Sequence, residues 1–148
     1  MTMPEASVMW LAVATALHAG FQLTVTSVVY PALVAVDAPD WTRAHTAHGR
    51  AITPVVVLTY GALLTAVAWS LWSATSQPLV WISAGGAALS MSATAFVAAP
   101  THSRLARQRD PALLRVLIVS DRVRAVGAVV ALAAALAAVV AQSGLPGD

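Results

Sequence analysis

The chain has 148 residues, of which 59% are hydrophobic and only 9% are charged. A soluble domain would carry about a quarter charged residues, so this composition excludes an ordinary soluble fold. All eight basic residues are arginines, and the absence of cysteine excludes disulfide and thiol-relay chemistry. We therefore expect an integral membrane protein whose pI near 9.9 reflects membrane orientation, with no nucleic-acid partner.

Four stretches are long and apolar enough to cross a hydrocarbon core, which takes about 20 helical residues. They lack the period-two alternation of barrel strands, so we expect helices. These helices should cover approximately residues 6–30, 52–73, 79–99 and 111–141, with a short interfacial helix over residues 41–49. The chain, residues 1–148, is thus predicted to be a single all-α domain: a four-transmembrane-helix bundle with a short interfacial helix between helices 1 and 2 and no internal repeat.

Capping residues mark one helix boundary. Asp110 and Pro111 fit an N-cap and a first helical position, so the fourth helix is expected to begin before it enters lipid. The two ends, residues 1–3 and 144–148, are expected to be disordered.

The arginines are distributed unevenly about these helices. Two fall between the first and second helices, and six fall between the third and fourth or in the first turns of the fourth: Arg43, Arg50, Arg104, Arg107, Arg109, Arg115, Arg122 and Arg124. The opposite side, which includes both termini, has no positive charge. By the positive-inside rule we expect cytoplasmic arginine-rich loops and both termini outside. Arginine without lysine, together with abundant alanine, favours a bacterial inner (plasma) membrane.

A narrow polar stripe follows the first helix. Steps of three or four residues place five side chains on one face: Thr15, His18, Gln22, Thr26 and Tyr30. Polar groups at this depth should face the bundle interior or a wet cavity. We expect Thr15, Gln22, Thr26 and Tyr30 to bind a substrate, and His18, near the midplane, to act as a catalytic base, proton relay or ligand. The alternative is that His18 bonds a serine or threonine of the third helix.

Three of the four histidines lie near the arginines. His45 and His48 share one helical face, and His102 follows the third helix. With Asp121 they could supply imidazole and carboxylate ligands for copper, iron or zinc, and the spacing does not choose among these metals. The alternative is that the histidines contact lipid phosphate or cap helix ends, and that Asp121 pairs with a neighbouring arginine.

Arg124 is the deepest arginine and lies three residues after Asp121. As a catalytic residue it would orient a substrate carboxylate or phenolate. The structural alternative is an ion pair with Asp121 at i,i+3 spacing.

Three short motifs carry a resemblance to a known family. They read Tyr30-Pro31-Ala32-Leu33, Pro100-Thr101-His102-Ser103-Arg104-Leu105 and Asp121-Arg122-Val123-Arg124-Ala125-Val126-Gly127. In these motifs and in its helical architecture the chain resembles the small four-helix membrane proteins grouped as anthrone oxygenase-like. The resemblance implies an apolar aromatic ligand and oxygenation of aromatic polyketides. The chain departs from the family at His102 and Asp121, where the family has asparagine, and at Arg122, where it has histidine.

Together these features favour an integral membrane oxidoreductase or oxygenase acting on a hydrophobic aromatic or quinone-like small molecule. A His-rich metal site at the cytoplasmic rim would support it, or, without metal, His18 would abstract a phenolic proton to give an oxygen-reactive carbanion. Two alternatives remain: a non-catalytic accessory subunit of a membrane complex, and a small oligomeric transporter. Membrane lipid is a further expected partner, and small residues on the last two helices permit a homo-oligomer.

Overall fold

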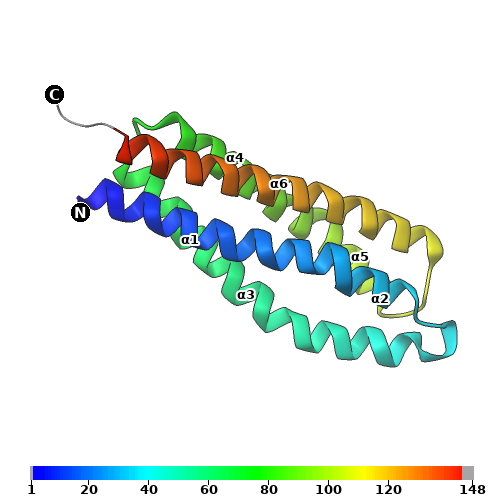
Figure 1. Cartoon of the computed structure of the whole chain (residues 1–148). Coiled ribbons are helices and arrows are strands. Elements are labelled where there is room, and N and C mark those ends of the chain that lie inside the picture. Colours follow the sequence, from blue (N-terminus) through cyan, green and yellow to red (C-terminus); the bar gives the residue numbers. More distant parts are fainter. Residues whose placement is uncertain (1, 145–148) are drawn as a thin grey trace.

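The computed structural model describes residues 2–144, in which four long helices pack side by side with both termini at one end (Figure 1). The elements in chain order are α1 (Met3–Thr24), the π turn η1 (Val25–Val29), α2 (Tyr30–Val34), the 3-10 turn η2 (Ala38–Asp40), α3 (Trp41–Ser73), α4 (Pro78–Ala93), the π turn η3 (Thr94–Ala98), α5 (Ala99–Leu105) and α6 (Pro111–Ser143). Strands are absent from this described part of the chain.

Four helical stretches are long and apolar enough to cross a membrane: Met3–Val34, Ala38–Ser73, Pro78–Leu105 and Pro111–Ser143. The predicted all-α four-helix bundle is therefore confirmed, and the chain is a multi-pass membrane protein. The end of the bundle opposite the termini, where α2, α5 and the first turns of α3 and α6 meet, is called the arginine-rich end from here on (Figure 1).

The segment expected to form a separate interfacial helix is helical but continuous with the second membrane helix. α3 is unbroken from Trp41 to Ser73 and carries Pro54 in its interior. Proline cannot donate to the carbonyl one turn back, and side-chain hydroxyls often support the backbone at such places in membrane helices. Here Thr53 Oγ1, one residue before the proline, donates to the Gly49 carbonyl at 2.7 Å, whereas the carbonyl four residues before Pro54 is that of Arg50. The second membrane helix therefore begins at Trp41 instead of near residue 52.

Two π turns interrupt the first and third membrane helices at equivalent places. η1 ends two residues before Pro31, and η3 ends two residues before Pro100. The first amide after each turn reaches back five residues, as that of Tyr30 does to the Val25 carbonyl. Such widened turns are typical next to proline and at functional sites. Each interrupted helix is followed by a 33-residue helix, α3 or α6.

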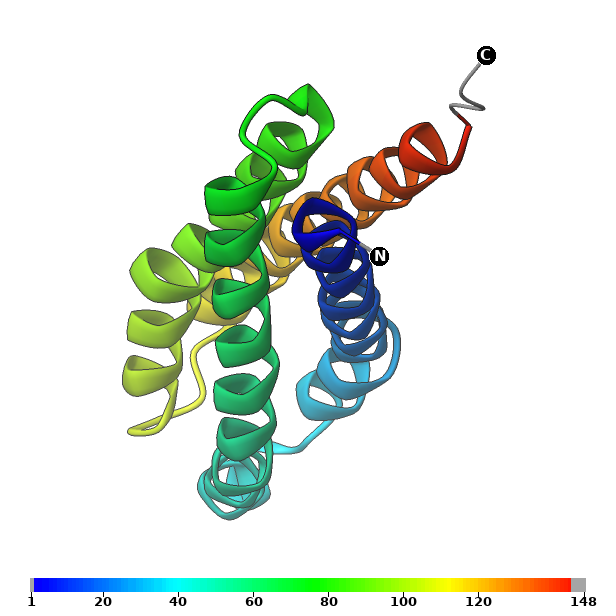
Figure 2. The same ribbon diagram turned by 90° about the vertical axis from the view of Figure 1, so that its left-hand side faces the viewer.

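The closest helix contact lies between α4 and α6. A Cβ atom on Gly86 would lie 2.7 Å from the Gly127 carbonyl oxygen and 2.7 Å from the Ala131 backbone nitrogen. Ser83 Oγ donates to the Ala131 carbonyl at 2.9 Å across the same contact. By contrast α3 is the least buried of the four membrane helices. Figure 2 shows it standing between α1–α2 on one side and α4–α5 on the other.

The N-terminal end of the described chain is held by a capping box. The Thr2 amide donates to Glu5 Oε2 at 2.7 Å, and the Glu5 amide donates to Thr2 Oγ1 at 3.4 Å. These reciprocal bonds satisfy two amides that the first helical turn leaves open. The expected disorder is therefore wrong for Thr2 and Met3, and also for Gly144, whose amide donates to the Val140 carbonyl at 3.0 Å at the end of α6. Residues 1 and 145–148 lie outside the described residues.

Candidate functional site

A cavity of about 280 Å³ lies toward the arginine-rich end, among α1–α2, the first half of α3, η3–α5 and α6. Its apolar lining comprises Phe21, Val25, Gly49, Ile52, Val56, Val57, Ala98 and Ala99, and its polar lining comprises Tyr30, His45, His48, Thr53, Thr94, His102 and Arg124. The structure thus brings the three rim histidines, Arg124 and Tyr30 to one cavity in an apolar bundle. Few convergent polar groups in an apolar pocket are typical of small-molecule sites.

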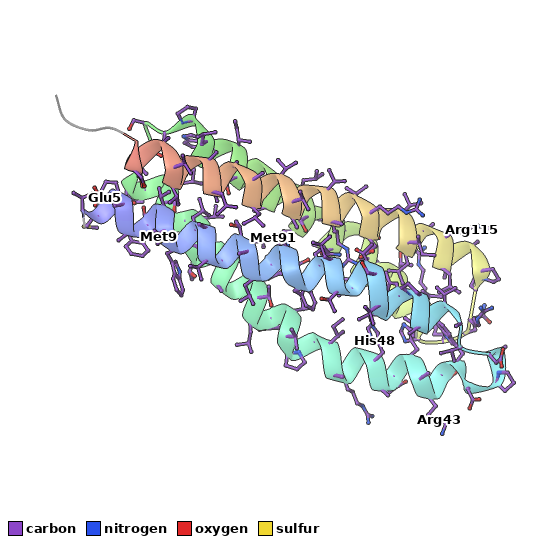
Figure 3. The ribbon with its side chains drawn as sticks, in the orientation of Figure 1. Glu5, Met9, Arg43, His48, Met91 and Arg115 are labelled. Carbon is purple, nitrogen blue, oxygen red and sulfur yellow. The ribbon has the colours of Figure 1, made fainter. Side chains whose placement is uncertain are left out.

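The three histidines come together from α3 and α5. His45 Nε2 and His102 Nδ1 are 3.1 Å apart, and their ring centroids are 5.4 Å apart. The ring of His48, one turn after His45 on α3, lies 5.9 Å from that of His102. His48 Nε2 is buried with no hydrogen-bond partner. In Figure 3, His48 lies on the side of α3 that faces the bundle, and Arg43 lies on the opposite side.

A chain of hydrogen bonds continues from the histidines into the bundle. His102 Nε2 lies 3.1 Å from the Tyr30 hydroxyl, and Arg124 Nη2 donates to that hydroxyl at 2.8 Å. Arg124 Nη2 also donates to Asp121 Oδ1 at 2.7 Å. These bonds define the polar chain Asp121–Arg124–Tyr30–His102–His45. It crosses from α6 to α2, α5 and α3, and so links all four membrane helices at the level of the cavity.

Asp121 lies at the far end of the polar chain from His45. Its Oδ1 accepts from Arg124 and, at 2.7 Å, from Gln22 Nε2. The arginine pairing considered as an alternative is therefore present. Within residues 2–144, no group of three or more His, Cys, Asp or Glu side chains is arranged to hold a metal ion. The structure thus gathers the three expected histidine ligands and places the fourth expected ligand, Asp121, in a separate ion pair.

The Arg124–Asp121 pair is buried at membrane depth. Arg124 is 6% exposed and Asp121 is 2% exposed. A buried ion needs its partner, because an uncompensated charge in apolar surroundings is costly. A single nitrogen, Nη2, donates to both Tyr30 and Asp121, and Nε is buried with no partner. A guanidinium has five N–H donors, so Arg124 has donors that its bonds to Tyr30 and Asp121 do not use.

His18 is placed away from this cavity. It is fully buried, and its Nε2 lies 3.0 Å from Ser90 Oγ on α4. The centroids of the His18 and Tyr60 rings are 4.9 Å apart in a T-shaped arrangement. The Tyr60 hydroxyl lies 2.7 Å from Thr94 Oγ1. His18 is not among the residues that line the cavity. The interhelical bond expected as the structural alternative is present.

The other stripe residues have separate positions. Thr15 Oγ1 donates to its own helix at Leu11, and Gln22 binds Asp121. Thr26 lines a second cavity, of about 260 Å³, on the α2–α6 side of the bundle. Of the four expected substrate-binding residues, only Tyr30 lines the first cavity, and it lines the second as well. The stripe therefore faces the interior as expected, but most of it serves helix packing.

The apolar half of the lining was missed by sequence analysis. Phe21, Ile52 and Val56 are ordinary membrane-helix residues, and apolar side chains occupy every face of such helices. Pro31 and Pro100 were the available signal in the sequence, because each follows a π turn that lies beside the cavity.

At the arginine-rich end, aromatic and cationic side chains join three helices. Trp41, which is 1% exposed, donates from Nε1 to the Leu105 carbonyl at 2.8 Å. Arg109 Nη2 donates to the Val34 carbonyl at 3.1 Å, and its Cζ lies 5.9 Å from the centroid of the Trp41 ring. These four residues, Trp41, Leu105, Arg109 and Val34, are called the Trp41 clasp. The clasp ties the start of α3 to the ends of α2 and α5.

Comparisons of the chain with protein-family models, with curated proteins and with solved structures found no match. The fold and the site define a four-helix membrane protein with a mainly apolar cavity and a buried polar chain in its wall. Its function is inferred below from these side chains.

Proposed function

We propose that this protein is a membrane oxidoreductase that binds a hydrophobic aromatic or quinone-like small molecule in the 280 Å³ cavity. The carrying observation is that Arg124, Tyr30 and three histidines line one cavity in an otherwise apolar bundle. Burial of aromatic surface would supply binding energy of about 25 cal/mol per Å², and the polar groups would set orientation. The resemblance to the anthrone oxygenase-like proteins points to the same ligand class.

In this proposal Arg124 binds an acidic oxygen of the ligand. The residue lines the cavity, and the two hydrogen bonds made by Nη2 use only part of the five N–H donors of a guanidinium. A fixed guanidinium in a water-poor site stabilises a phenolate or enolate far better than water-exposed arginine does. Tyr30 and Asp121 hold the guanidinium in place through the Nη2 bonds.

The His102–His45 pair is the proposed base, a role first expected for His18. A neutral imidazole of this pair accepts the proton that leaves the ligand. The His45 ring and the Tyr30 hydroxyl are both hydrogen-bonded to His102. For an anthrone, loss of the acidic ring proton gives a carbanion that dioxygen, the co-substrate, oxidises. The ring CH₂ becomes a carbonyl, dioxygen is reduced, and one water is released.

A metal ion on the histidines is the second candidate. His45 Nε2 and His102 Nδ1, 3.1 Å apart, have nearly the separation of two ligands on one ion with bonds of about 2.0–2.1 Å. His48 Nε2 is unpartnered, but no three such side chains of residues 2–144 are arranged to hold an ion, so His48 would have to move to become the third donor. Imidazole suits copper, iron and zinc, so the donor set does not select one. Asp121 forms an ion pair with Arg124, so it is not among the ligands of this proposed metal site.

The test combines metal analysis with oxygen uptake on detergent-purified protein. Wild type is compared with the triple variant His45→Ala/His48→Ala/His102→Ala, with Arg124→Gln, and with the exposed control Arg43→Gln. Anthrone is the probe substrate. Oxygen uptake that needs Arg124 and the histidines without bound metal supports the base mechanism. Stoichiometric metal that vanishes in the triple variant supports the metal version. No binding and no oxygen uptake would overturn the oxidoreductase and favour the accessory-subunit or transporter alternatives.

We also propose that the arginine-rich end faces the cytoplasm of a bacterial inner membrane, by the positive-inside rule. The cysteine-free chain permits a direct test with single cysteines at two exposed positions, Ser76→Cys near the termini and Gln108→Cys at the arginine-rich end. In intact cells a membrane-impermeant maleimide should label the Ser76→Cys variant alone. Labelling of the Gln108→Cys variant alone would reverse the orientation.

A further inference from the structure

Three residues that line the cavity are also exposed on the outside of the bundle: Thr53, Val57 and Ala99. The first two are one turn apart on α3, and the third begins α5. Val57 is 64% exposed. The other lining residues are buried or half-buried. The cavity therefore opens on the flank of the bundle, between α3 and α5.

The surface around this opening is strongly apolar. Leu58, next to Val57 on α3, is 74% exposed, and Phe96 of η3 is 79% exposed. Both lie in stretches apolar enough to span a membrane. Large apolar side chains with such exposure are stable against lipid and unfavourable against water. The opening consequently faces hydrocarbon.

The two ends of the cavity are closed by packed side chains. At the arginine-rich end, the Trp41 clasp adjoins a buried apolar cluster that contains Leu33, Leu105, Leu114 and Leu117. Toward the termini, the Tyr60–Thr94 hydroxyl contact and fully buried Leu63 fill the bundle. Both routes along the bundle axis are thus occupied, while the route between α3 and α5 is lined by the exposed residues Thr53, Val57 and Ala99.

We infer that the ligand enters from the lipid bilayer through the opening between α3 and α5, so that the site takes membrane-dissolved, uncharged molecules. This inference rests on the proposed function for the identity of the ligand. A molecule that crosses the hydrocarbon must be neutral, because carrying a charge there costs several kcal/mol. Its acidic oxygen meets Arg124 only after entry. Val57 and Ala99 are then entry residues, and Arg124 is a binding residue.

A kinetic experiment separates entry from binding. Wild-type protein in lipid nanodiscs is mixed with 1-hydroxyanthraquinone, followed by the probe's own fluorescence. Val57→Phe and Ala99→Phe, which narrow the opening, should slow association and dissociation together by about tenfold and leave Kd nearly unchanged. Leu58→Phe, which faces lipid beside the opening, is the matched control and should leave both rates unchanged. Unchanged rates in both narrowed variants, or faster binding after Trp41→Ala alone, would overturn lateral entry.

A second measurement needs no ligand. A nitroxide spin label on Thr53→Cys reports which medium reaches the opening, with Arg43→Cys as a water-exposed control. We expect the label at position 53 to collide mainly with dioxygen, which concentrates in lipid, and the label at position 43 to collide mainly with a water-soluble nickel chelate. Nickel-dominated collisions at position 53 would overturn the lipid-facing opening. If the opening faces lipid but wild type does not bind the probe, the proposed function fails and the lipid-facing opening stands.

Discussion

Arg124 on α6 donates from Nη2 to the Tyr30 hydroxyl on α2 at 2.8 Å, and the same nitrogen binds Asp121 at 2.7 Å. One nitrogen thus binds two partners: the neutral Tyr30 hydroxyl, which lines the cavity, and the Asp121 carboxylate, whose negative charge balances the guanidinium. Because the two contacts differ in charge, they can be separated by mutation. Loss of the Tyr30 hydroxyl should affect the ligand with little effect on folding, while loss of either charge should also destabilise the fold.

Tyr30→Phe removes the hydroxyl that connects Arg124 to His102 and keeps the buried ring. We expect a loss of about tenfold in oxygen uptake with anthrone, because the base and the guanidinium lose their common contact. The free energy of unfolding should fall by only about 1 kcal/mol, the usual net value of one hydrogen bond. The other tyrosine is the matched control: Tyr60 does not line the cavity, and Tyr60→Phe loses its hydroxyl contact with Thr94. Equal losses of activity in the two variants would contradict a special role for Tyr30.

Arg124→Gln should destabilise the fold strongly, because the buried Asp121 carboxylate then keeps its hydrogen bond from Gln22 and loses its positive partner. Removing one partner of a buried ion pair typically costs about 3–5 kcal/mol. The double variant Arg124→Gln/Asp121→Asn should recover part of this loss, since no charge is then stranded. Unfolding in mixed micelles gives the free energies.

The control for this pair is a second i,i+3 ion pair, Arg43–Asp40, whose side chains are 84% and 61% exposed. Arg43→Gln should change stability little, because exposed pairs are weak. A loss as large as that in Arg124→Gln would show that burial is not the cause. Failure of the double variant to recover stability would show that Asp121 does not depend on the guanidinium.

His18 and Ser90 should form a structural pair. Interhelical polar bonds in membranes are worth about 0.6 kcal/mol on average and up to about 1.7 kcal/mol. A double-mutant cycle with His18→Ala and Ser90→Ala should therefore give a coupling energy in this range, and Ser92→Ala, an exposed position on the same helix, should show none. Folded His18→Ala protein should retain oxygen uptake with anthrone. Loss of uptake at full stability would return His18 to the catalytic role.

The α4–α6 contact should tolerate no added methyl group at Gly86. A Cβ there meets backbone atoms of both Gly127 and Ala131, which cannot move aside as a flexible side chain can. Gly86→Ala should destabilise the bundle by about 1–3 kcal/mol, as overpacking does. Gly85→Ala is the control, because its Cβ meets nothing within 4 Å, and it should be neutral or slightly stabilising. Similar melting temperatures for the two variants would argue against close backbone packing.

Local signals predicted much of this structure correctly. The apolar stretches gave four membrane helices, because only helices that are long and apolar enough can satisfy the backbone in lipid. Asp110 caps α6 as expected, accepting from the Ala112 and Leu113 amides. In contrast the second membrane helix, expected to begin near residue 52, begins at Trp41, so Pro54 lies inside α3 and not at its start. Proline costs no hydrogen bond at the start of a helix and is also tolerated in the interior of membrane helices, so the residue itself does not distinguish the two positions.

The candidate site was predicted only in its polar half. The sequence by itself determined the four spans, the interior-facing stripe of helix 1, and the gathering of arginines and three histidines at one end, since these follow from chain length, helical period and the order of the helices. Only the tertiary structure decided which polar groups meet. It paired Asp121 with Arg124 and Gln22, His18 with Ser90, and His102 with Tyr30 and His45. These pairings depend on the rotation and depth of each helix against its neighbours, and packing sets both.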